Sequence, residues 1–338
     1  MKRIRLAIVG CGGFVRYHVR GMSEGPAAFQ CVGLADTVRQ RAEKLAEDHF
    51  AADAPAIHTD HAKMLRQVRP DAVIVSTPHT LHFRHAYDAI SAGAHVMVEK
   101  PMVTNADDAR KLVARAKARK RILQVAIQGM YTDTFAYARK LIRDGTMGPL
   151  QLITGIMAQG WMAGNRGQWR QNPRLSGGGQ LYDSTAHVLS AMMFLADSPV
   201  REAFCWADKK GRRVDINAVA AIRFANGCMG SLTSGGNCPS WCSRLTLQGA
   251  GAMLEISAHG GEFRVNSRKL KKEITGVPRG WKIRTVSPIR NFADAIRRKA
   301  KPRVTGYLGV LLADLMDALY ESAGTGRPAK VTRRPPKG

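Results

Sequence analysis

The chain has 338 residues, which exceeds what one hydrophobic core usually organises and predicts two domains. No apolar run reaches the roughly 18 residues needed to cross a bilayer, so we expect a soluble protein with no membrane partner. The formal net charge of +26 attracts polyanions, but the basic clusters contain no interleaved aromatic residues and match no nucleic-acid-binding module. We therefore expect a solvated basic surface and no specific nucleic-acid partner.

The six cysteines are scattered along the chain. Their spacing shows neither a dense disulfide framework nor the paired C-x-x-C of a zinc site, so we expect free thiols and no metal. The opening stretch "MKRIRLAIVGCGG" has an apolar patch too short for a signal peptide and is typical of a first buried strand. Together these features favour the cytoplasm. The cysteines are Cys11, Cys31, Cys205, Cys228, Cys238 and Cys242.

Short apolar runs alternate with helical patterns from the start of the chain. The runs are continuous rather than alternating in polarity, which indicates a parallel sheet covered on both faces. We therefore predict an N-terminal Rossmann domain, a doubly wound α/β fold, over residues 1–128. Ligands of such sheets bind beyond the carboxyl ends of the strands. The strand candidates are "IRLAIVG", "FQCVGLAD", "DAVIVSTP", "AHVMVEKP" and "RILQVAIQ", and the helical patterns cover residues 15–22, 38–49, 81–92, 106–120 and 134–143.

The pattern changes after Gly148 and Pro149 to successive strands, with one strong helical pattern at 183–195. This order predicts a C-terminal α+β domain with a large, mostly antiparallel open sheet over residues 129–330. Helical patterns at 289–299 and 309–323 close the chain, and we expect these last helices to pack back on the first domain. Residues 331–338 form a basic tail. The strand candidates are "LQLITGIMA", "REAFCWAD", "NAVAAIRF", "CMGSLTS", "SRLTLQG", "AMLEISA" and "EFRVNS".

A glycine-rich turn, "VGCGGFVRYH", follows the first strand candidate and precedes a helical pattern. Gly10, Gly12 and Gly13 let the backbone turn tightly and approach a pyrophosphate at the helix N-terminus, where Phe14 and Val15 also lie. Val15 stands where the G-x-G-x-x-G pattern has its third glycine. Alone, the turn could also be incidental.

The second strand candidate ends in Asp36. A carboxylate at this position accepts hydrogen bonds from the adenosine ribose, and an ordinary helix N-cap is the alternative. Because a carboxylate repels a 2'-phosphate, the sequence favours NAD over NADP, although the nearby Arg39 leaves NADP open.

The third strand candidate ends at Ser76, Thr77 and Pro78, where the nicotinamide half of a dinucleotide would pass. His79 and His82 follow. We expect them at the edge of the cofactor, and the alternative is the polar start of a helix.

The fourth strand candidate ends in two ionisable side chains, Glu99 and Lys100, and Pro101 stops the strand so that the amine stays at the crevice. A lysine beside a nicotinamide can hydrogen-bond a substrate hydroxyl oxygen and stabilise negative charge as its proton leaves. Glu99 either orients this amine or holds a ribose. An exposed ion pair is the alternative.

Three glycines at 177–179 precede the helical pattern that carries Asp183 and His187. A spacing of four residues places both side chains on one helix face. They are either a substrate clamp and general base or a buried hydrogen-bonded pair.

These motifs follow one another as in the glucose-fructose oxidoreductase / inositol dehydrogenase (Gfo/Idh/MocA) family, which the chain resembles over nearly its whole length. The resemblance rests on "GCGGFVRYH", "GLADTVRQRAEKLA", "VSTPHTLHFRHAYDAISAGAHVMVEKPM" and "LSGGGQLYDSTAHVL", and on the closing stretch from "NFADAIRRKAKPRVTGY" to "GRPAKV". It implies an NAD(P)-dependent oxidoreductase acting on a sugar, polyol or similar polyhydroxylated substrate. It also implies a homodimer or homotetramer joined through the C-terminal sheet.

By position, the resemblance makes Lys100 the lysine of the E-K-P signature and Asp183 with His187 the catalytic dyad. It implies that His187 takes the proton from a substrate hydroxyl, Lys100 polarises that oxygen and Asp183 positions it, while hydride passes to the nicotinamide.

The resemblance implies further contacts outside these three residues. Trp169 and Arg170 look like substrate-pocket residues, and Gln128 resembles the amide position near the nicotinamide. Two positions depart from the family pattern. Val15 replaces a usual small residue in the phosphate loop, which bears on cofactor affinity. The stretch "QGMYTD" (128–133) lacks the arginine common after the sixth strand, which bears on substrate choice.

Two other functions stay open. An NAD-dependent redox glycosidase resembles this family but usually lacks the D-x-x-x-H helix. A non-catalytic sensor or co-regulator that binds a dinucleotide would not need Lys100, Asp183 and His187. Because all three are present, the sequence favours a dehydrogenase.

Overall fold

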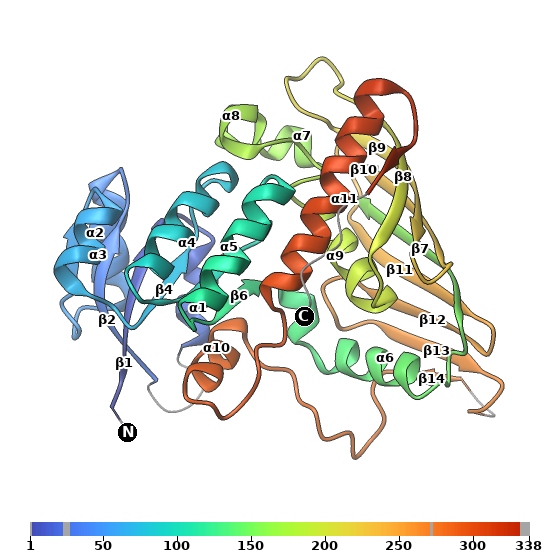
Figure 1. Ribbon diagram of the computed structural model, residues 1–338, viewed down its shortest axis with the longest axis horizontal. Coiled ribbons are helices and arrows are strands. Elements are labelled where there is room, and N and C mark those ends of the chain that lie inside the picture. The colour runs from blue at the N-terminus through green and yellow to red at the C-terminus, as the bar shows by residue number, and fades with distance from the viewer. Residues whose placement is uncertain (1, 23–27, 271–272, 332–338) are drawn as a thin grey trace. The chain divides into compact units, whose positions relative to one another are not determined.

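The computed structural model describes residues 2–22, 28–270 and 273–331, which form two compact units. The first unit runs to Val103 and also contains Asp107–Ala126 and Val286–Gly306. The second unit contains Thr104–Ala106, Ile127–Thr285 and the chain from Tyr307 onward. Figure 1 colours both units along the chain.

The first unit is built on a six-stranded parallel sheet, which confirms the predicted doubly wound fold. The strand order is β3-β2-β1-β4-β5-β6. The short strand β3 was not predicted. The strands are β1 (Ile4–Val9), β2 (Phe29–Ala35), β3 (Ala56–His58), β4 (Ala72–Val75), β5 (His95–Glu99) and β6 (Leu123–Ala126). The helices are α1 (Val15–Gly21), α2 (Arg39–His49), α3 (His61–Val68), η1 (His79–Leu81), α4 (His82–Ser91), α5 (Ala106–Ala118) and α10 (Pro288–Ile296).

The core of the first unit explains its continuous apolar strands. All four residues of β4 are buried, because helices cover both faces of the sheet. Helix α10, from near the end of the chain, contacts α1, and its Ile289 and Phe292 join the same core. Residues 286–306 therefore belong to the first unit. Of the last two helices, α11 lies in the second unit.

The second unit contains a nine-stranded sheet in the order β14-β13-β12-β11-β7-β10-β9-β8-β15. Strand β7 lies between β11 and β10, and its pairing with β10 is parallel. The other pairings are antiparallel, as predicted. The strands are β7 (Leu150–Ala158), β8 (Val200–Asp208), β9 (Asn217–Phe224), β10 (Met229–Gly235), β11 (Cys242–Gly249), β12 (Ala252–Ser257), β13 (Phe263–Ser267), β14 (Ile274–Thr275) and β15 (Ala329–Lys330). The helices are η2 (Gln128–Tyr131), α6 (Asp133–Arg143), α7 (Trp161–Gly164), η3 (Trp169–Gln171), α8 (Pro173–Ser176), α9 (Thr185–Ala196) and α11 (Gly306–Thr325).

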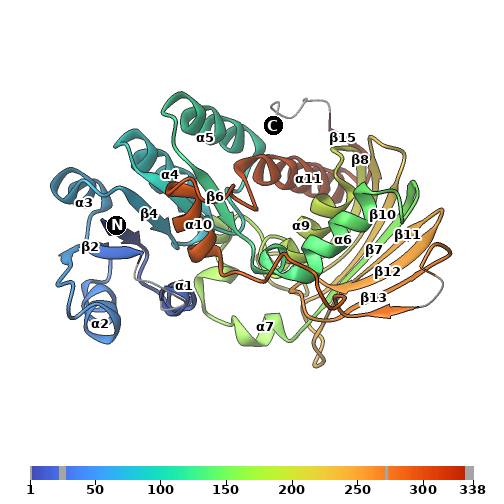
Figure 2. The same ribbon diagram turned by 90° about the horizontal axis from the view of Figure 1, so that it is seen from below.

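The two faces of this sheet differ in polarity. Along β9, buried and exposed residues alternate, because successive side chains point to opposite faces. The inner face packs on the apolar helix α9, which contacts β7 and β11 (Figure 2). The helix predicted from residue 183 begins at Thr185.

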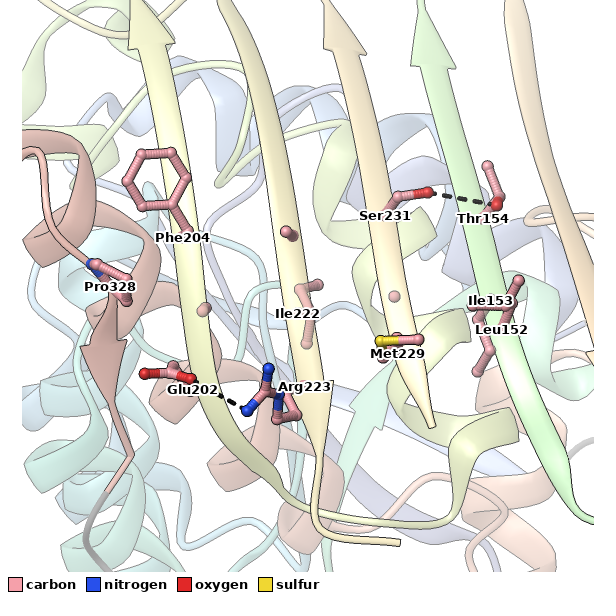
Figure 3. A pocket seen from close by; sticks show the side chains of 13 residues that line it. Leu152, Ile153, Thr154, Glu202, Phe204, Ile222, Arg223, Met229, Ser231 and Pro328 are labelled. Carbon is pink, nitrogen blue, oxygen red and sulfur yellow. Dashed lines mark hydrogen bonds and ion pairs between the residues drawn. The ribbon is translucent and has the colours of Figure 1, made fainter. Parts of the chain in front are cut away.

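The outer face exposes large apolar side chains in register. Trp206 lies opposite Val219, and Met229 lies beside Leu152 on the neighbouring strand. Trp206 is 66% exposed and Met229 is 52% exposed. A depression of about 430 Å³ lies on this face. Figure 3 shows the side chains that line it, among them Leu152 and Met229.

Within residues 2–22, 28–270 and 273–331, no helix combines the length and apolar character needed to span a membrane. All six cysteines are free thiols. Of the predicted basic tail, only Val331 falls inside the described residues; 332–338 lie outside them.

Candidate functional site

The glycine-rich turn follows β1 and leads into α1. Gly10 has a φ of +92°, and a Cβ atom there would lie 2.5 Å from the carbonyl oxygen of Ser76, so only glycine fits. A Cβ atom on Gly12 or Gly13 would meet nothing within 4 Å, which leaves open space beside the backbone at the start of the helix. These features fit a pyrophosphate.

Phe14 and Val15 complete this turn. The Phe14 side chain is 41% exposed, whereas the Val15 side chain is fully buried in the core. Because the Val15 side chain is buried, this residue can contact a phosphate only through its backbone amide. The residue that replaces the third glycine serves packing.

Asp36 comes directly after β2 and braces the glycine-rich turn. Its carboxylate accepts the backbone N–H of Cys11 and that of Val38, each at 2.9 Å. Carboxylate oxygens have further lone pairs, so Asp36 can also accept ribose hydroxyls. Burial, followed by the charge of Asp36, raises the pKa of the Cys11 thiol, which therefore stays protonated.

The residues after β4 pack against the same turn. The backbone N–H of Ser76 donates to the carbonyl of Val9 at 2.8 Å. The Thr77 hydroxyl lies 3.0 Å from Nδ1 of His85. Pro78 ends this segment, and His79, at the start of η1, is buried.

His82 is fully buried and joins two segments of the backbone. Its ring nitrogens lie 2.7 Å from the carbonyl oxygens of Thr77 and Pro101. Burial lowers the pKa of His82, and the two carbonyls oppose that shift because they favour the protonated ring. His82 thus ties the end of β4 to the segment after β5, and its contact with a cofactor stays a prediction.

Strand β5 ends at Glu99, and the peptide bond between Lys100 and Pro101 is cis. The Glu99 carboxylate contacts Nε2 of His18 on α1 and accepts the backbone N–H of Lys100 at 3.2 Å. Glu99 and His18 are both buried, and Lys100 is only 9% exposed. Glu99 is therefore engaged by His18, a residue that sequence reasoning did not identify.

The second unit holds the other predicted site residues. Gln128 is half-buried at the start of η2. Asp183 is 6% exposed, and its carboxylate accepts Nε1–H of Trp161 at 2.7 Å and forms an ion pair with Nε of Arg170 at 2.9 Å. The Arg170 guanidinium lies 4.6 Å from the centre of the Trp169 ring. The structure thus brings together Trp169, Arg170 and Asp183, and adds Trp161.

Asp215 organises the turn that carries Asp183. Its carboxylate accepts the backbone N–H groups of Gly179, at 2.7 Å, and Leu181, at 2.8 Å, and the hydroxyl of Tyr320 donates to it. A Cβ atom on Gly179 would lie 1.9 Å from the Asp215 carbonyl oxygen, so the close approach requires glycine. Burial raises the pKa of Tyr320, which keeps its hydroxyl as a donor.

His187 lies in the first turn of α9 and is 7% exposed. The turn before it is irregular, because the Thr185 N–H donates to the Gln180 carbonyl, five residues earlier. The simple four-residue spacing of a regular helix therefore does not describe Asp183 and His187. The His187 ring packs against His259, with 4.5 Å between ring centres.

Comparison with known proteins assigns both parts of the chain to one family. Residues 4–127 match the Gfo/Idh/MocA oxidoreductase family, NAD-binding Rossmann fold, and residues 135–255 match the GFO/IDH/MocA C-terminal domain. The matched family is NAD-binding, in agreement with the fit of the glycine-rich turn and Asp36.

Curated relatives align with part of the chain. The D-glucoside 3-dehydrogenase of Escherichia coli is 28% identical over 203 residues, which cover 58% of this chain and 55% of the relative. The inositol 2-dehydrogenase of Paracoccus denitrificans is 29% identical over 150 residues, 44% of each chain. The chain thus spans about half the length of the curated relatives it matches.

Solved structures share the whole fold. Aldose-aldose oxidoreductase from Caulobacter crescentus superposes with a TM-score of 0.85 at 22% identity, over 97% of this chain and 100% of that one. An inositol dehydrogenase homologue from Azotobacter vinelandii, complexed with NAD+, gives a TM-score of 0.83 at 22% identity, over 97% of each chain. The two family matches and the shared architecture confirm the resemblance: the chain belongs to the Gfo/Idh/MocA family of oxidoreductases.

Proposed function

We propose that the protein is an NAD-dependent dehydrogenase that oxidises a hydroxyl group of a sugar, a polyol or a related polyhydroxylated compound. The observation that carries this proposal is the buried His187 on an otherwise apolar helix, a few residues after a carboxylate held by Trp161 and Arg170. Named relatives support it, since they include a D-glucoside 3-dehydrogenase and inositol 2-dehydrogenases.

We assign three roles to side chains. The His187 imidazole accepts the proton of the substrate hydroxyl, and the Lys100 ammonium stabilises the negative charge that develops on that oxygen. Asp183, fixed by Arg170, positions the hydroxyl by hydrogen bonding. Bound NAD+ supplies the acceptor for the hydride that leaves the same carbon.

The cofactor is NAD rather than NADP in this proposal. The Asp36 carboxylate accepts ribose hydroxyls and repels a 2'-phosphate. Arg41 forms an ion pair with Asp36 at 3.9 Å, and Arg39 pairs with Glu43 at 2.7 Å. The free thiols support a reducing cytoplasm as the place of action.

The test is NADH formation across a panel of inositols, aldoses and anhydrosugars. We expect one class of substrate to reduce NAD+. Release of a sugar by hydrolysis of a glycoside, without net NADH, would favour a redox glycosidase. NAD binding with no turnover of any panel member would favour a sensor or co-regulator.

We also propose that the protein forms a homodimer or homotetramer through the outer face of the nine-stranded sheet. Its exposed apolar side chains support this, since monomeric proteins rarely leave large apolar patches open. Trp206, Val219 and Met229 lie on adjacent strands and supply a contact that a second copy can cover.

A further inference from the structure

The turn between β12 and β13, residues 258–262, is fixed against η2. A Cβ atom on Gly129 would lie 2.0 Å from the carbonyl oxygen of Ala258, so the two backbones touch. On the other side, Gly260 has a φ of +81°, and a Cβ atom there would lie 2.4 Å from Cγ2 of Thr132. Contacts this close leave the turn little freedom to shift.

This turn presents His259, whose ring is held by its neighbours. Its Nδ1 lies 3.0 Å from the hydroxyl oxygen of Ser243, a buried residue on β11. The centre of the His259 ring lies 4.5 Å from that of His187, with 42° between the ring planes. The Trp241 ring lies 5.5 Å away.

The orientation of His187 follows from this arrangement. Helix α9 contributes no other ionisable side chain, and its remaining residues are apolar or small. A ring that packs against His187 and is itself anchored to Ser243 restricts the rotamers that His187 can adopt. A proton acceptor held in one orientation is more effective, because a misplacement of about 1 Å can cost about 100-fold in rate.

We infer that His259 is a positioning residue that holds the His187 imidazole in the orientation in which it accepts the substrate proton. This inference rests on the proposed function of His187. His259 takes no proton from the substrate and acts through His187 alone.

The first test compares kcat and KM in variants of the full-length protein. In His259→Ala we expect kcat to fall by about 10- to 100-fold, with KM for the sugar and for NAD+ within about threefold of wild type. His259→Phe keeps a ring against His187 but loses the bond to Ser243, and Ser243→Ala loses only that bond. We expect the kcat of both variants to lie between that of wild type and that of His259→Ala. The exposed His49→Ala serves as control and keeps full activity.

The second test is a double-mutant cycle with His187. If His259 acts through His187, the double variant His187→Ala, His259→Ala is no slower than His187→Ala alone. Multiplicative losses in the double variant, or full kcat in His259→Ala, would overturn the inference. Wild-type kcat in His187→Ala would instead overturn the proposed base, so the two failures are distinguishable. Thermal melting of each variant checks that it folds. If His259→Ala does not fold, the double-mutant cycle with His187 is repeated with His259→Phe and with Ser243→Ala, and the same outcomes test the inference.

Discussion

Two ionisable residues, Glu99 and Lys100, lie at the end of the buried strand β5. A Glu99 carboxylate buried alone would be costly, and the His18 imidazole from α1 contacts it directly. Lys100 therefore follows a glutamate that is already paired with His18. Because His18 lies on α1, the same contact links the helix that follows the glycine-rich turn to the end of β5.

Replacing His18 with Leu removes this contact and keeps an apolar side chain. Because Glu99 then stays buried without the imidazole, we expect the free energy of unfolding to fall by about 2–4 kcal/mol, measured by urea denaturation. The double variant His18→Leu, Glu99→Gln has no charged group at either position and should recover part of that loss. A change below about 0.5 kcal/mol in His18→Leu would contradict the coupling.

We expect Asp36 to decide the choice between NAD and NADP. Replacing it with Asn removes the charge that repels a 2'-phosphate, so the ratio of kcat/KM for NAD over that for NADP should fall by about tenfold or more. Asp71→Asn is the matched control, since Asp71 accepts the backbone N–H of Arg5 at the opposite edge of the sheet. An unchanged ratio in Asp36→Asn would show that Asp36 does not read the ribose.

At the scale of elements, α3 and α4 hold histidines that couple stability to pH. The centre of the His85 ring lies 4.4 Å from that of His61, and Nδ1 of His85 lies 3.0 Å from the Thr77 hydroxyl. Burial, with a smaller effect of His61, lowers the pKa of His85 to about 4. The unfolded chain thus binds more protons than the folded one between pH 6.5 and 4.

His85 should therefore destabilise the fold as the pH falls through this window. We expect the His85 contribution lost between neutral pH and about pH 4 to be roughly 1–3 kcal/mol. The measurement compares urea denaturation of wild type and His85→Asn at both pH values. The variant should show the smaller decrease, and the exposed His49→Asn should behave like wild type. Equal decreases in wild type and His85→Asn would contradict the assignment.

Helices and strands could be predicted from the sequence wherever apolar residues repeat in a regular pattern. The apolar runs of β1, β4 and β5 and the alternation of β9 follow directly from burial on two faces or on one. Strand β3 has only three residues, none of them buried, so no pattern marks it. The start of α9 was displaced by two residues because Asp215, distant in sequence, shapes the turn before it.

The candidate site also contains residues that a local sequence pattern predicts and residues that only tertiary contacts reveal. The glycines, Asp36 and Lys100 could be predicted as site candidates because they directly follow predicted strands. His18, Trp161 and His259 carry no local pattern, and their roles arise only from tertiary contacts. Hydrogen bonding across long stretches of chain, such as Asp215 with Tyr320, cannot be inferred from spacing.

At the scale of the whole molecule, the exposed outer face predicts self-association. Trp206→Glu places a charge on that face, so we expect the mass measured by light scattering to fall to that of one chain. Trp241→Glu is the control, because Trp241 is 60% exposed but precedes β11 instead of lying on the outer face. A wild-type protein that is already monomeric, or a Trp206→Glu variant of unchanged mass, would contradict an interface there.

The central proposal is that Lys100 and His187 are both catalytic residues of the proposed dehydrogenase. The direct measurement is steady-state turnover of Lys100→Met and His187→Gln on the best panel substrate, with NADH affinity followed by fluorescence. We predict that kcat falls by at least about 100-fold in each variant while NADH affinity stays within about threefold of wild type. Wild-type turnover in either variant would contradict the account.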